Sequence, residues 1–307
     1  MTAYLISIGT FVGLFMILAL ALNLQWGMTG MVNFGIAGFY GLGAYASGLL
    51  TVKAGWPVGA GIAAAAALGL AFGAAVSFLS VRLREDFLAI VTLGFGEIVR
   101  LVLLNEDWLT NGPRGLPIPV RPLADQFDRE GYALFYFLLV AAVVALTFIV
   151  VERIRRSPYG RALKAIREDD VVAAVLGKNV LAFRVQVFAL GAAFMAVAGA
   201  LLAHYIQNIS PDIFTPMVAI FIWMSVIVGG AGNNKGLLIG AGLVMLVLEG
   251  TRFMGDFVAF LDAEKLSAIR IILIGATLIL VLRFRPRGIM PEQKFRVAET
   301  RGESGSF

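Results

Sequence analysis

Residues 132–151 read YALFYFLLVAAVVALTFIVV, and residues 152–181 read ERIRRSPYGRALKAIREDDVVAAVLGKNVL. The first stretch has no charged residue and has about the 20-residue length that an α-helix needs to cross a bilayer. The second begins with a cluster of basic residues, and such clusters mark the cytoplasmic end of a membrane helix. Together they predict a transmembrane helix that ends, at the cytoplasmic face, in a polar segment.

The composition of the whole chain is that of a membrane protein. Of 307 residues, 59% are apolar and 15% are charged, with a mean hydropathy of +0.87. Soluble domains carry about 25% charged residues, so the composition argues against a soluble enzyme. The chain has no cysteine and a single histidine, His204, which excludes disulfides, cysteine-bound metal and multi-histidine sites. We therefore expect no metal, no cofactor and no enzymatic activity of this chain.

A 20-residue window predicts nine spans along the chain. They cover residues 3–24, 33–52, 58–80, 87–105, 132–151, 183–206, 216–231, 236–252 and 268–283. We predict an all-α, polytopic membrane bundle of about 8–10 transmembrane helices. Residues 1–307 form one transmembrane domain, in which 152–182 is a cytoplasmic loop and 283–307 a cytoplasmic tail.

Local motifs predict some boundaries and contacts. Ser157-Pro158 and Thr215-Pro216 each place a capping hydroxyl before a proline that suits the first helical position. Gly69-x3-Gly73 and Gly236-x3-Gly240 present small residues on one helix face, which favours close helix packing.

The distribution of charge predicts the orientation of the chain. Basic residues concentrate at 82–84, at 152–184 and from 283 onward, whereas the segment 105–131 is mainly acidic. The positive-inside rule places the first three in the cytoplasm and 105–131 outside, and the span count then puts the N-terminus outside. Because no basic patch lies outside these membrane-flanking positions, we expect no nucleic-acid partner.

A weak similarity relates two halves of the chain. The spans that end near 151 and 283 are each followed by a basic cluster, and Glu97 with Arg100 resembles Glu249 with Arg252. Each half, about 33–156 and 183–288, would hold four spans in the same orientation. An internal repeat, which is common in transport folds, is possible.

The segment 157–181 predicts two short helices in the cytoplasm. Ser157 caps the first, with Leu163 and Ile166 as its apolar points, and Asp169 or Asp170 caps the second. Val171, Val172, Val175 and Leu176 form the apolar face of the second helix, which ends at Gly177 or Asn179. So small a unit does not fold alone, so its apolar faces must contact the ends of the spans, a partner or the lipid surface.

Polar residues within apolar runs are candidates for a translocation path. The stretch 23–35, NLQWGMTGMVNFG, predicts either a broken helix lining a path or an ordinary cytoplasmic turn. Glu97 lies near mid-span, where a charge needs a partner, and Arg100 one turn later suits that role. The candidates are Asn23, Gln25, Thr29, Asn33, Thr92, Glu97 and Arg100.

At this point several stretches resemble one known family. SPYGRALKAIREDDVVAAVLGKN resembles the cytoplasmic loop of permeases of branched-chain amino acid ABC importers, the LivM/LivH family, and LivM is the more similar half. Agreement continues, in order, at 18–50, 83–103, 109–119 and 226–244. The sequence departs at Lys235-Gly236-Leu237, where the family usually has a Gly-Pro pair, and family members often have additional N-terminal sequence.

The resemblance implies a transport subunit of the bacterial inner membrane and its partners. These would be a second, LivH-like permease, two ABC ATPase subunits that hydrolyse ATP, and an extracytoplasmic substrate-binding protein. It implies ATPase coupling by Ser157, Arg161, Ala165, Arg167, Glu168, Asp169, Asp170, Ala174 and Gly177. Candidates for docking the binding protein are Asn111, Arg114, Asp212, Glu249 and Arg252.

The sequence allows alternatives for the substrate and for the class of transporter. Branched-chain or related hydrophobic amino acids are the expected cargo, while similar scaffolds carry urea, short amides or other small solutes. An ion-coupled secondary transporter would need more intramembrane carboxylates than Glu97 and Glu249 supply.

Overall fold

The computed structural model describes residues 2–80, 85–123 and 127–257 and parts of 269–292, and these residues are mostly helical. The first half comprises α1 (Thr2–Leu22), the π-helical turn η1 (Asn23–Gly27), α2 (Ile36–Lys53), α3 (Val58–Ser80), α4 (Glu85–Asn105), α5 (Asp107–Thr110) and η2 (Gly112–Arg114). The second comprises α6 (Arg129–Arg156), α7 (Pro158–Glu168), α8 (Asp170–Val175), α9 (Val180–Ile206), η4 (Pro211–Phe214), α10 (Pro216–Gly229) and α11 (Asn234–Phe257). The two-residue strands β1 (Leu116–Pro117) and β2 (Asn208–Ile209) pair in antiparallel fashion.

The predicted spans coincide with these helices, which confirms the all-α polytopic bundle. Within the described part of the chain, five helices are long and apolar enough to cross a membrane, and α10 is a shorter apolar helix. The segments 33–52 and 236–252 correspond to α2 and α11. The last predicted span, 268–283, is described only in part, and its described residues are helical.

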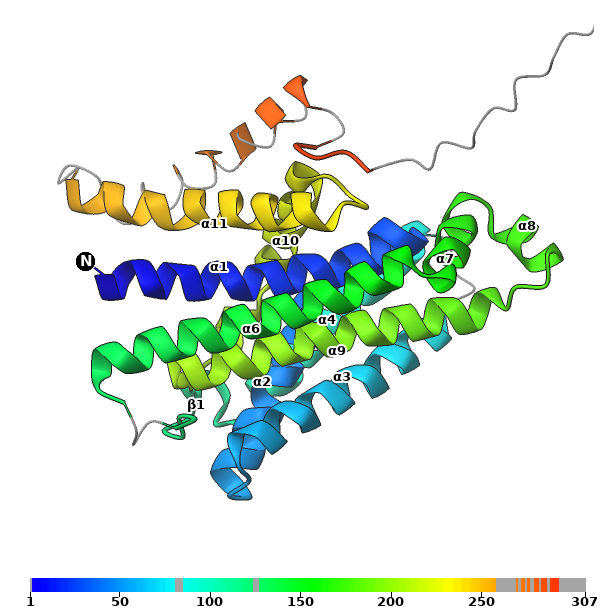
Figure 1. Ribbon diagram of the computed structural model, residues 1–307. Helices are drawn as coiled ribbons and strands as arrows, with labels where there is room; N and C mark the ends of the chain where they lie inside the picture. The colour runs from blue at the N-terminus through cyan, green and yellow to red at the C-terminus, as the bar shows by residue number, and fades with distance from the viewer. Residues whose placement is uncertain are drawn as a thin grey trace, which may run out of the picture.

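The helices lie roughly along one axis around α9 (Figure 1). Among the five candidate spans, α9 is the most buried, because α2 and α3 pack along it over much of its length. On the other side, α1 packs against α6 and α11, and α10 packs against α11. The central helices are rich in glycine and alanine, which lets their backbones approach closely.

Both predicted glycine pairs mark close helix contacts, as expected. Gly69 and Gly73 of α3 lie against the backbone and methyl groups of Ala189, Ala192 and Ala193 of α9. Gly236 and Gly240 of α11 lie against carbonyls of α10. In lipid such close packing replaces the hydrophobic driving force that water provides.

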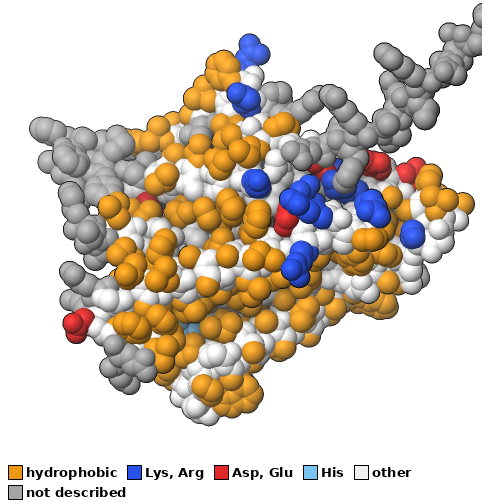
Figure 2. Space-filling view, viewed as in Figure 1, with side chains coloured by type: hydrophobic (Ala, Val, Ile, Leu, Met, Phe, Trp, Pro, Cys, Tyr) orange, Lys and Arg blue, Asp and Glu red, His pale blue; other side chains and the backbone are white. Residues whose placement is uncertain are grey.

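The two ends of the bundle differ in charge. The ends of α1, α6 and α10 and the beginnings of α9 and α11 lie at the same end as α7 and α8 (Figure 1). Lys and Arg side chains gather at this end, whereas apolar side chains cover the flank of the bundle (Figure 2). We call it the basic end and the opposite one the outer end. Arg82 and Arg84 lie outside the described residues.

Helix direction in the two predicted halves follows the same order. From α2 to α6 the spans run alternately away from and toward the basic end, and from α9 onward they do so again. Alternation alone does not establish a repeat, so internal duplication stays a prediction. At α10 one expectation was wrong: Pro216 is the first helical residue, but Thr215 makes no capping hydrogen bond.

Replacing Gly199 by alanine should destabilise the bundle. A Cβ there would collide with the backbone carbonyl of Tyr40 on α2, which no rotamer change relieves. We expect a loss of about 1–3 kcal/mol, seen as a lower thermal unfolding midpoint of the purified protein in detergent. Gly94→Ala is the control, since a Cβ on Gly94 meets nothing within 4 Å. Equal midpoints for both variants would contradict this account of the packing.

Candidate functional site: coupling helices and buried polar network

The helix α7 is built by local signals and docks on its own chain. Ser157 Oγ accepts a hydrogen bond from the Gly160 backbone N–H at 3.2 Å, and Pro158 is the first helical residue. Leu163 and Ile166 are buried against the bundle, as the sequence predicted. Ala165 and Arg161 are exposed on the other side. The helix therefore has one face on the bundle and one face free of its own chain.

The short helix α8 presents an uncovered apolar face. Asp169 Oδ1 accepts from the Val172 backbone N–H at 2.9 Å, and Gly177, with φ of 78°, follows the end of the helix. Ala174 and Glu168 are exposed. So is the apolar face of this helix, with exposed fractions of 53–83%, formed by Val171, Val172, Val175 and Leu176. Within the described part of the chain, the apolar face of α7 is covered and that of α8 is not.

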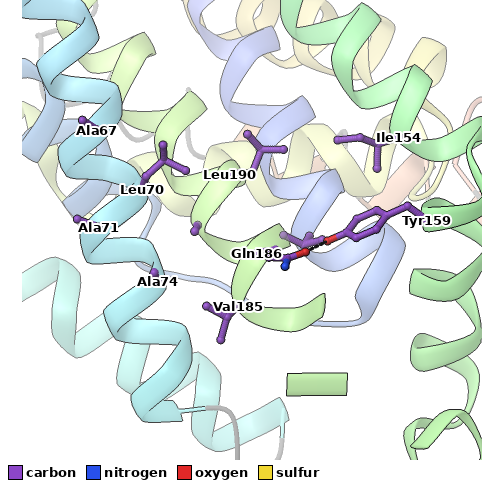
Figure 3. A pocket seen from close by; sticks show the side chains of 11 residues that line it. Ala67, Leu70, Ala71, Ala74, Ile154, Tyr159, Val185, Gln186 and Leu190 are labelled. Carbon is purple, nitrogen blue, oxygen red and sulfur yellow. Dashed lines mark hydrogen bonds between the residues drawn. The ribbon is translucent and has the colours of Figure 1, made fainter. Parts of the chain in front are cut away.

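Three contacts fix this pair of helices on α9. The Asp170 carboxylate pairs with Arg184 at 3.0 Å. Tyr159 stacks on Phe183 with ring centroids 4.9 Å apart, and its hydroxyl donates to Gln186 Oε1 at 3.0 Å. Figure 3 shows this bond at the edge of an apolar groove of about 690 Å³ between α3 and α9.

A segment near the C-terminus also binds α7. Backbone N–H groups of Ile289 and Met290 donate to the carbonyls of Val228 and Gly229 at the end of α10. This places the Glu292 carboxylate against α7, where Lys164 Nζ lies 2.5 Å and Arg167 Nη2 2.8 Å from its oxygens. Burial alone would raise the pKa of Glu292, but the hydrogen bonds from the two cations hold it below its ordinary value. Glu292 is therefore ionised at neutral pH and holds α7 to the α10–α11 connection.

Arg167 makes a second contact that points into the bundle. Its other guanidinium nitrogen, Nη1, donates to the backbone carbonyl of Gly27, the last residue of η1. α7 is thus bonded directly to the region in which the first span is broken.

Residues 23–35 form buried irregular backbone inside the bundle. After the π-helical turn, two helical residues follow, and 30–34 have no helical structure before α2 begins. Asn23, Gln25, Thr29 and Asn33 are at most 2% exposed. Helix breaks at such depth persist only where protein groups satisfy the freed backbone.

The side chains of the break supply those partners. Gln25 Nε2 donates to the Phe188 carbonyl of α9 at 2.8 Å, and its Oε1 accepts from Asn33 Nδ2 at 2.8 Å. Asn33 Oδ1 accepts from the Gly35 N–H at 2.7 Å, while Trp223 Nε1 of α10 donates to the Asn33 carbonyl at 2.9 Å. The break is therefore bonded to α9 and α10.

It is bonded to α4 as well. The Phe34 N–H donates to Thr92 Oγ1 at 3.0 Å, and Thr92 is fully buried. This contact brings Thr92 together with the polar residues of 23–35, from which it is separated by about 60 positions in the sequence.

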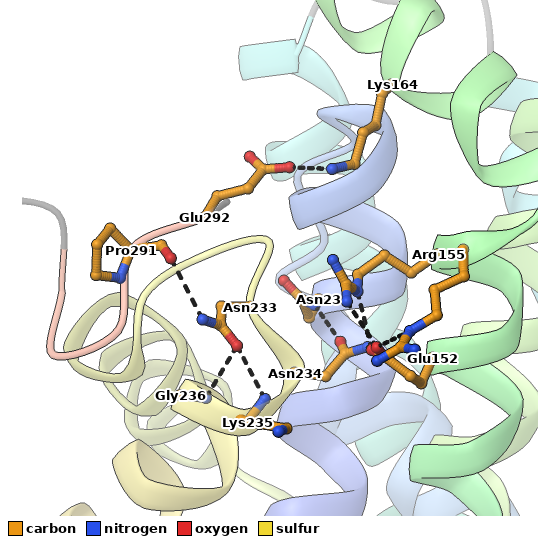
Figure 4. A network of polar contacts seen from close by, with 11 residues as sticks. Asn23, Glu152, Arg155, Lys164, Asn233, Asn234, Lys235, Gly236, Pro291 and Glu292 are labelled. Atoms are coloured by element: carbon orange, nitrogen blue, oxygen red, sulfur yellow. Dashed lines mark hydrogen bonds and ion pairs between the residues drawn. The ribbon is translucent and has the colours of Figure 1, made fainter. Parts of the chain in front are cut away.

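A third group of contacts links the break to the α10–α11 turn (Figure 4). Asn23 Nδ2 donates to Asn234 Oδ1 at 2.9 Å, and Asn23 Oδ1 accepts from the Gly232 N–H at 2.8 Å. Asn234 in turn donates to Glu152 Oε2 at 2.8 Å, and Glu152 pairs with Arg155 at 2.6 Å. The glycine-rich turn 229–236 thus serves as a packing and hydrogen-bonding element of the basic end.

Five of the seven predicted path residues therefore lie in the buried break or bond to it, and two do not. Glu97 and Arg100 form the predicted ion pair at 2.9 Å, on the outer half of α4 and partly exposed. The network residues are closed off from solvent in this conformation. A role of any of the seven in translocation stays a prediction.

The residues predicted to dock the binding protein fall into two groups, one near η2 and η4 and one on α11. Asn111, with φ of 66°, precedes η2, and Arg114 is its last residue. The β1–β2 pairing sets this loop beside η4, which carries Asp212. Glu249 is on α11, which packs against α1 and α10. Arg252 also belongs to α11, but its side chain lies outside the described part.

Sequence reasoning missed several residues of the network. These are Glu152, Lys164, Trp223, Asn234 and Glu292, and each bonds to a partner 82 to 211 positions away in the chain. The adjacent asparagines of GGAGNNKG were the one available signal, because amides in an apolar chain need partners. Within the described ranges, no group of three or more His, Cys, Asp or Glu side chains is placed to hold a metal ion.

Comparisons with known proteins identify the family. The model of the family described as "Branched-chain amino acid transport system / permease component" matches residues 4–282. The chain belongs to this permease family. It is a multi-pass membrane permease component, and its relatives include two kinds of permease protein, LivM and LivH.

Relatives of both kinds cover most of the permease. The high-affinity branched-chain amino acid transport system permease protein LivM of Escherichia coli is 31% identical over 93% of this chain and 70% of its own. LivM of Salmonella typhimurium is 30% identical over 97% and 73%. LivH of E. coli is 28% identical over 89% and 90%. No solved structure matches the permease.

Removing the charge of Glu292 should weaken the attachment of α7. Glu292→Gln leaves Lys164 and Arg167 without a carboxylate, and we expect a loss of about 1 kcal/mol of stability at pH 7. Because the pKa of Glu292 is lowered, its contribution is complete above the ordinary value of 4.5 and is lost as the pH falls below it.

Thermal unfolding of both proteins across this pH range measures the effect. The difference in midpoint should be constant near neutrality and shrink at acidic pH. Glu168→Gln, an exposed change on the same helix, is the control. A difference that grows as the pH falls would contradict the assignment.

Proposed function

We propose that the permease is one of two permease subunits of an ATP-binding-cassette importer of the bacterial inner membrane. A second, LivH-like permease would complete the pathway, which fits the existence of two related kinds of permease protein among the relatives. Branched-chain amino acids are the proposed cargo, since both kinds of relative are named for their transport. ATP hydrolysis is assigned to separate subunits, and this chain has no catalytic role.

The apolar face of α8 is the observation that carries the proposal. Four large side chains there are more than half exposed at the basic end of the bundle, beside a helix that is firmly docked. Exposed clusters of this kind mark contact surfaces. A partner ATPase subunit would cover them.

A lipid surface fits the same face less well. Helices that lie on anionic membranes carry Lys and Arg on their polar side. Around α8 the charged residues at its start are instead acidic, namely Glu168, Asp169 and Asp170. A protein partner with a basic rim suits this arrangement better.

The contacts of α7 describe how motion of the ATPases would reach the membrane. Closure of the ATPases on ATP would shift α7 as a rigid body. Arg167 bonds α7 to the carbonyl of Gly27, and the break 23–35 bonds to α4 through Thr92 and to α10 through Trp223. A shift of α7 would therefore be passed to spans on several sides of the bundle. Opening first outward and then inward would result.

Charge distribution supports the proposed orientation. The basic end would face the cytoplasm, with the C-terminal tail inside and the N-terminus outside. The binding protein would then dock at the outer end, where the β1–β2 pairing holds the loop that carries Asn111 and Arg114.

A charge on the apolar face of α8 should detach the ATPases. Val175 is 83% exposed, so Val175→Asp is not expected to affect folding. Loss of one buried apolar contact and burial of a carboxylate should lower retention of the ATPases on affinity-purified permease by about tenfold or more. Quantitative immunoblotting of the purified complex measures this.

The same substitution at the opposite end is the control. Leu123 is 52% exposed at the outer end, and Leu123→Asp should retain the ATPases at the wild-type level. Retention by Val175→Asp equal to that of the control would remove the proposed role of α8.

Removing the bond from α7 to the break should uncouple hydrolysis from transport. In Arg167→Gln the contacts with Gly27 and Glu292 are lost, while the exposed face of α8 is unchanged. We expect ATP hydrolysis within about twofold of wild type and uptake reduced about tenfold in proteoliposomes. Arg153→Gln, an exposed arginine in the last turn of α6, should leave both rates unchanged. Uptake and hydrolysis that fall together would contradict a transmitting role.

A further inference from the structure

The ion pair on α4 lies at a depth in the span where exposing charged side chains to lipid is costly in free energy. Glu97 is 12 residues from the start of α4 and 8 from its end, or about 18 Å and 12 Å along the helix. Arg100 Nε donates to Glu97 Oε2 at 3.0 Å and Nη2 to the same oxygen at 2.9 Å. Even so, the two side chains remain 32% and 23% exposed. The pair is therefore on the surface of the isolated chain, in the outer half of a membrane span.

Such a pair would not face lipid. Charged side chains within the hydrocarbon region face protein or a water-filled cavity, and they mark pathways of substrates and ions. This chain leaves part of the pair uncovered, so another subunit or water must cover it. A position between the two permeases meets both conditions.

A third charge joins the pair. The helix η4 packs against α4 near its outer end, and it carries the exposed acidic residue Asp212. Glu97 satisfies the guanidinium of Arg100 from one side. The carboxylate of Asp212 has no hydrogen bond to another residue of the described part of the chain. The two packed elements, α4 and η4, thus carry one guanidinium and two carboxylates.

We propose that Asp212, Arg100 and Glu97 form a subsite for the charged head of an α-amino acid, at the interface between the two permeases. The substrate carboxylate would bind Arg100, and its ammonium group would bind Asp212 and Glu97. The proposal rests on the proposed function and names the part of the substrate that the pathway recognises. The site is incomplete without the second permease, which closes the uncovered side.

The surroundings suit the rest of such a substrate. Ile98 and Leu101 are 63% and 45% exposed next to the pair on α4. An aliphatic side chain would contact them while the head group contacts the charges. A substrate with a charged head and a short apolar tail thus matches both parts of this surface.

Leucine uptake by the assembled transporter tests the subsite. Proteoliposomes contain both permeases and the ATPases, with binding protein in excess. Asp212→Asn is the first variant because it leaves the Glu97–Arg100 pair intact, and Glu97→Gln is the second. We expect uptake reduced about tenfold, with ATP hydrolysis stimulated by leucine-loaded binding protein within about twofold of wild type. Asp128→Asn, an exposed acid at the outer end, should change neither.

Each other outcome has a distinct meaning. Normal uptake by Asp212→Asn and Glu97→Gln overturns the subsite and leaves the proposed function standing. A parallel loss of uptake and stimulated hydrolysis assigns these residues to assembly or docking, which also overturns it. If the wild-type complex shows no ATP-driven uptake of leucine, the proposed function itself fails.

Labelling provides a second measurement that does not depend on transport. The chain has no cysteine, so Leu101→Cys introduces a single thiol beside the cluster. In complexes with cysteine-free partners, a charged methanethiosulfonate reagent should react with Leu101→Cys and not with Leu146→Cys, on the exposed face of α6. Absence of reaction at Leu101→Cys would place this face in lipid or in a dry interface and would overturn the proposal.

Discussion

The fold depends on the hydrogen bonds that satisfy a stretch of irregular backbone inside a bundle of membrane-spanning helices. Residues 28–35 lie between α1 with its π-helical turn and α2, and they are largely buried. In lipid each unpaired N–H or carbonyl would cost several kcal/mol, so the amides of Gln25 and Asn33, the hydroxyl of Thr92 and the indole of Trp223 must bond there. Those bonds fix the relative positions of four spans.

The same network connects the membrane part with the basic end. Arg167 reaches the break from α7, and Asn23 reaches the α10–α11 turn and, through Asn234, the end of α6. α8 lies beyond this connected unit, and its apolar face is uncovered. The uncovered apolar face of α8 is thus connected, through a few bonds made by α7, to buried polar groups of the spans. That arrangement suits a subunit whose motion is imposed from outside.

Local and compositional signals in the sequence predicted the helices. They did not predict contacts between residues far apart in the chain. The length of apolar runs is enough to locate spans, and Ser157, Pro158 and Asp169 define α7 and α8 because capping is a contact between near neighbours. The polar residues of 23–35 were recognised, but a path lining and a turn demand the same residue types. Glu292 was not recognised, because its bond to Lys164 depends on where the chain returns after more than a hundred residues.

Hydrogen exchange of residues 28–35 in the assembled transporter tests the central claim most directly. The account holds that α7 and the break move as one unit when the ATPases close. Trapping the complex with ATP should change the exchange of peptides covering 28–35 together with those covering 158–168, relative to the nucleotide-free complex. A change confined to α7, with exchange in 28–35 the same in both states, would contradict it.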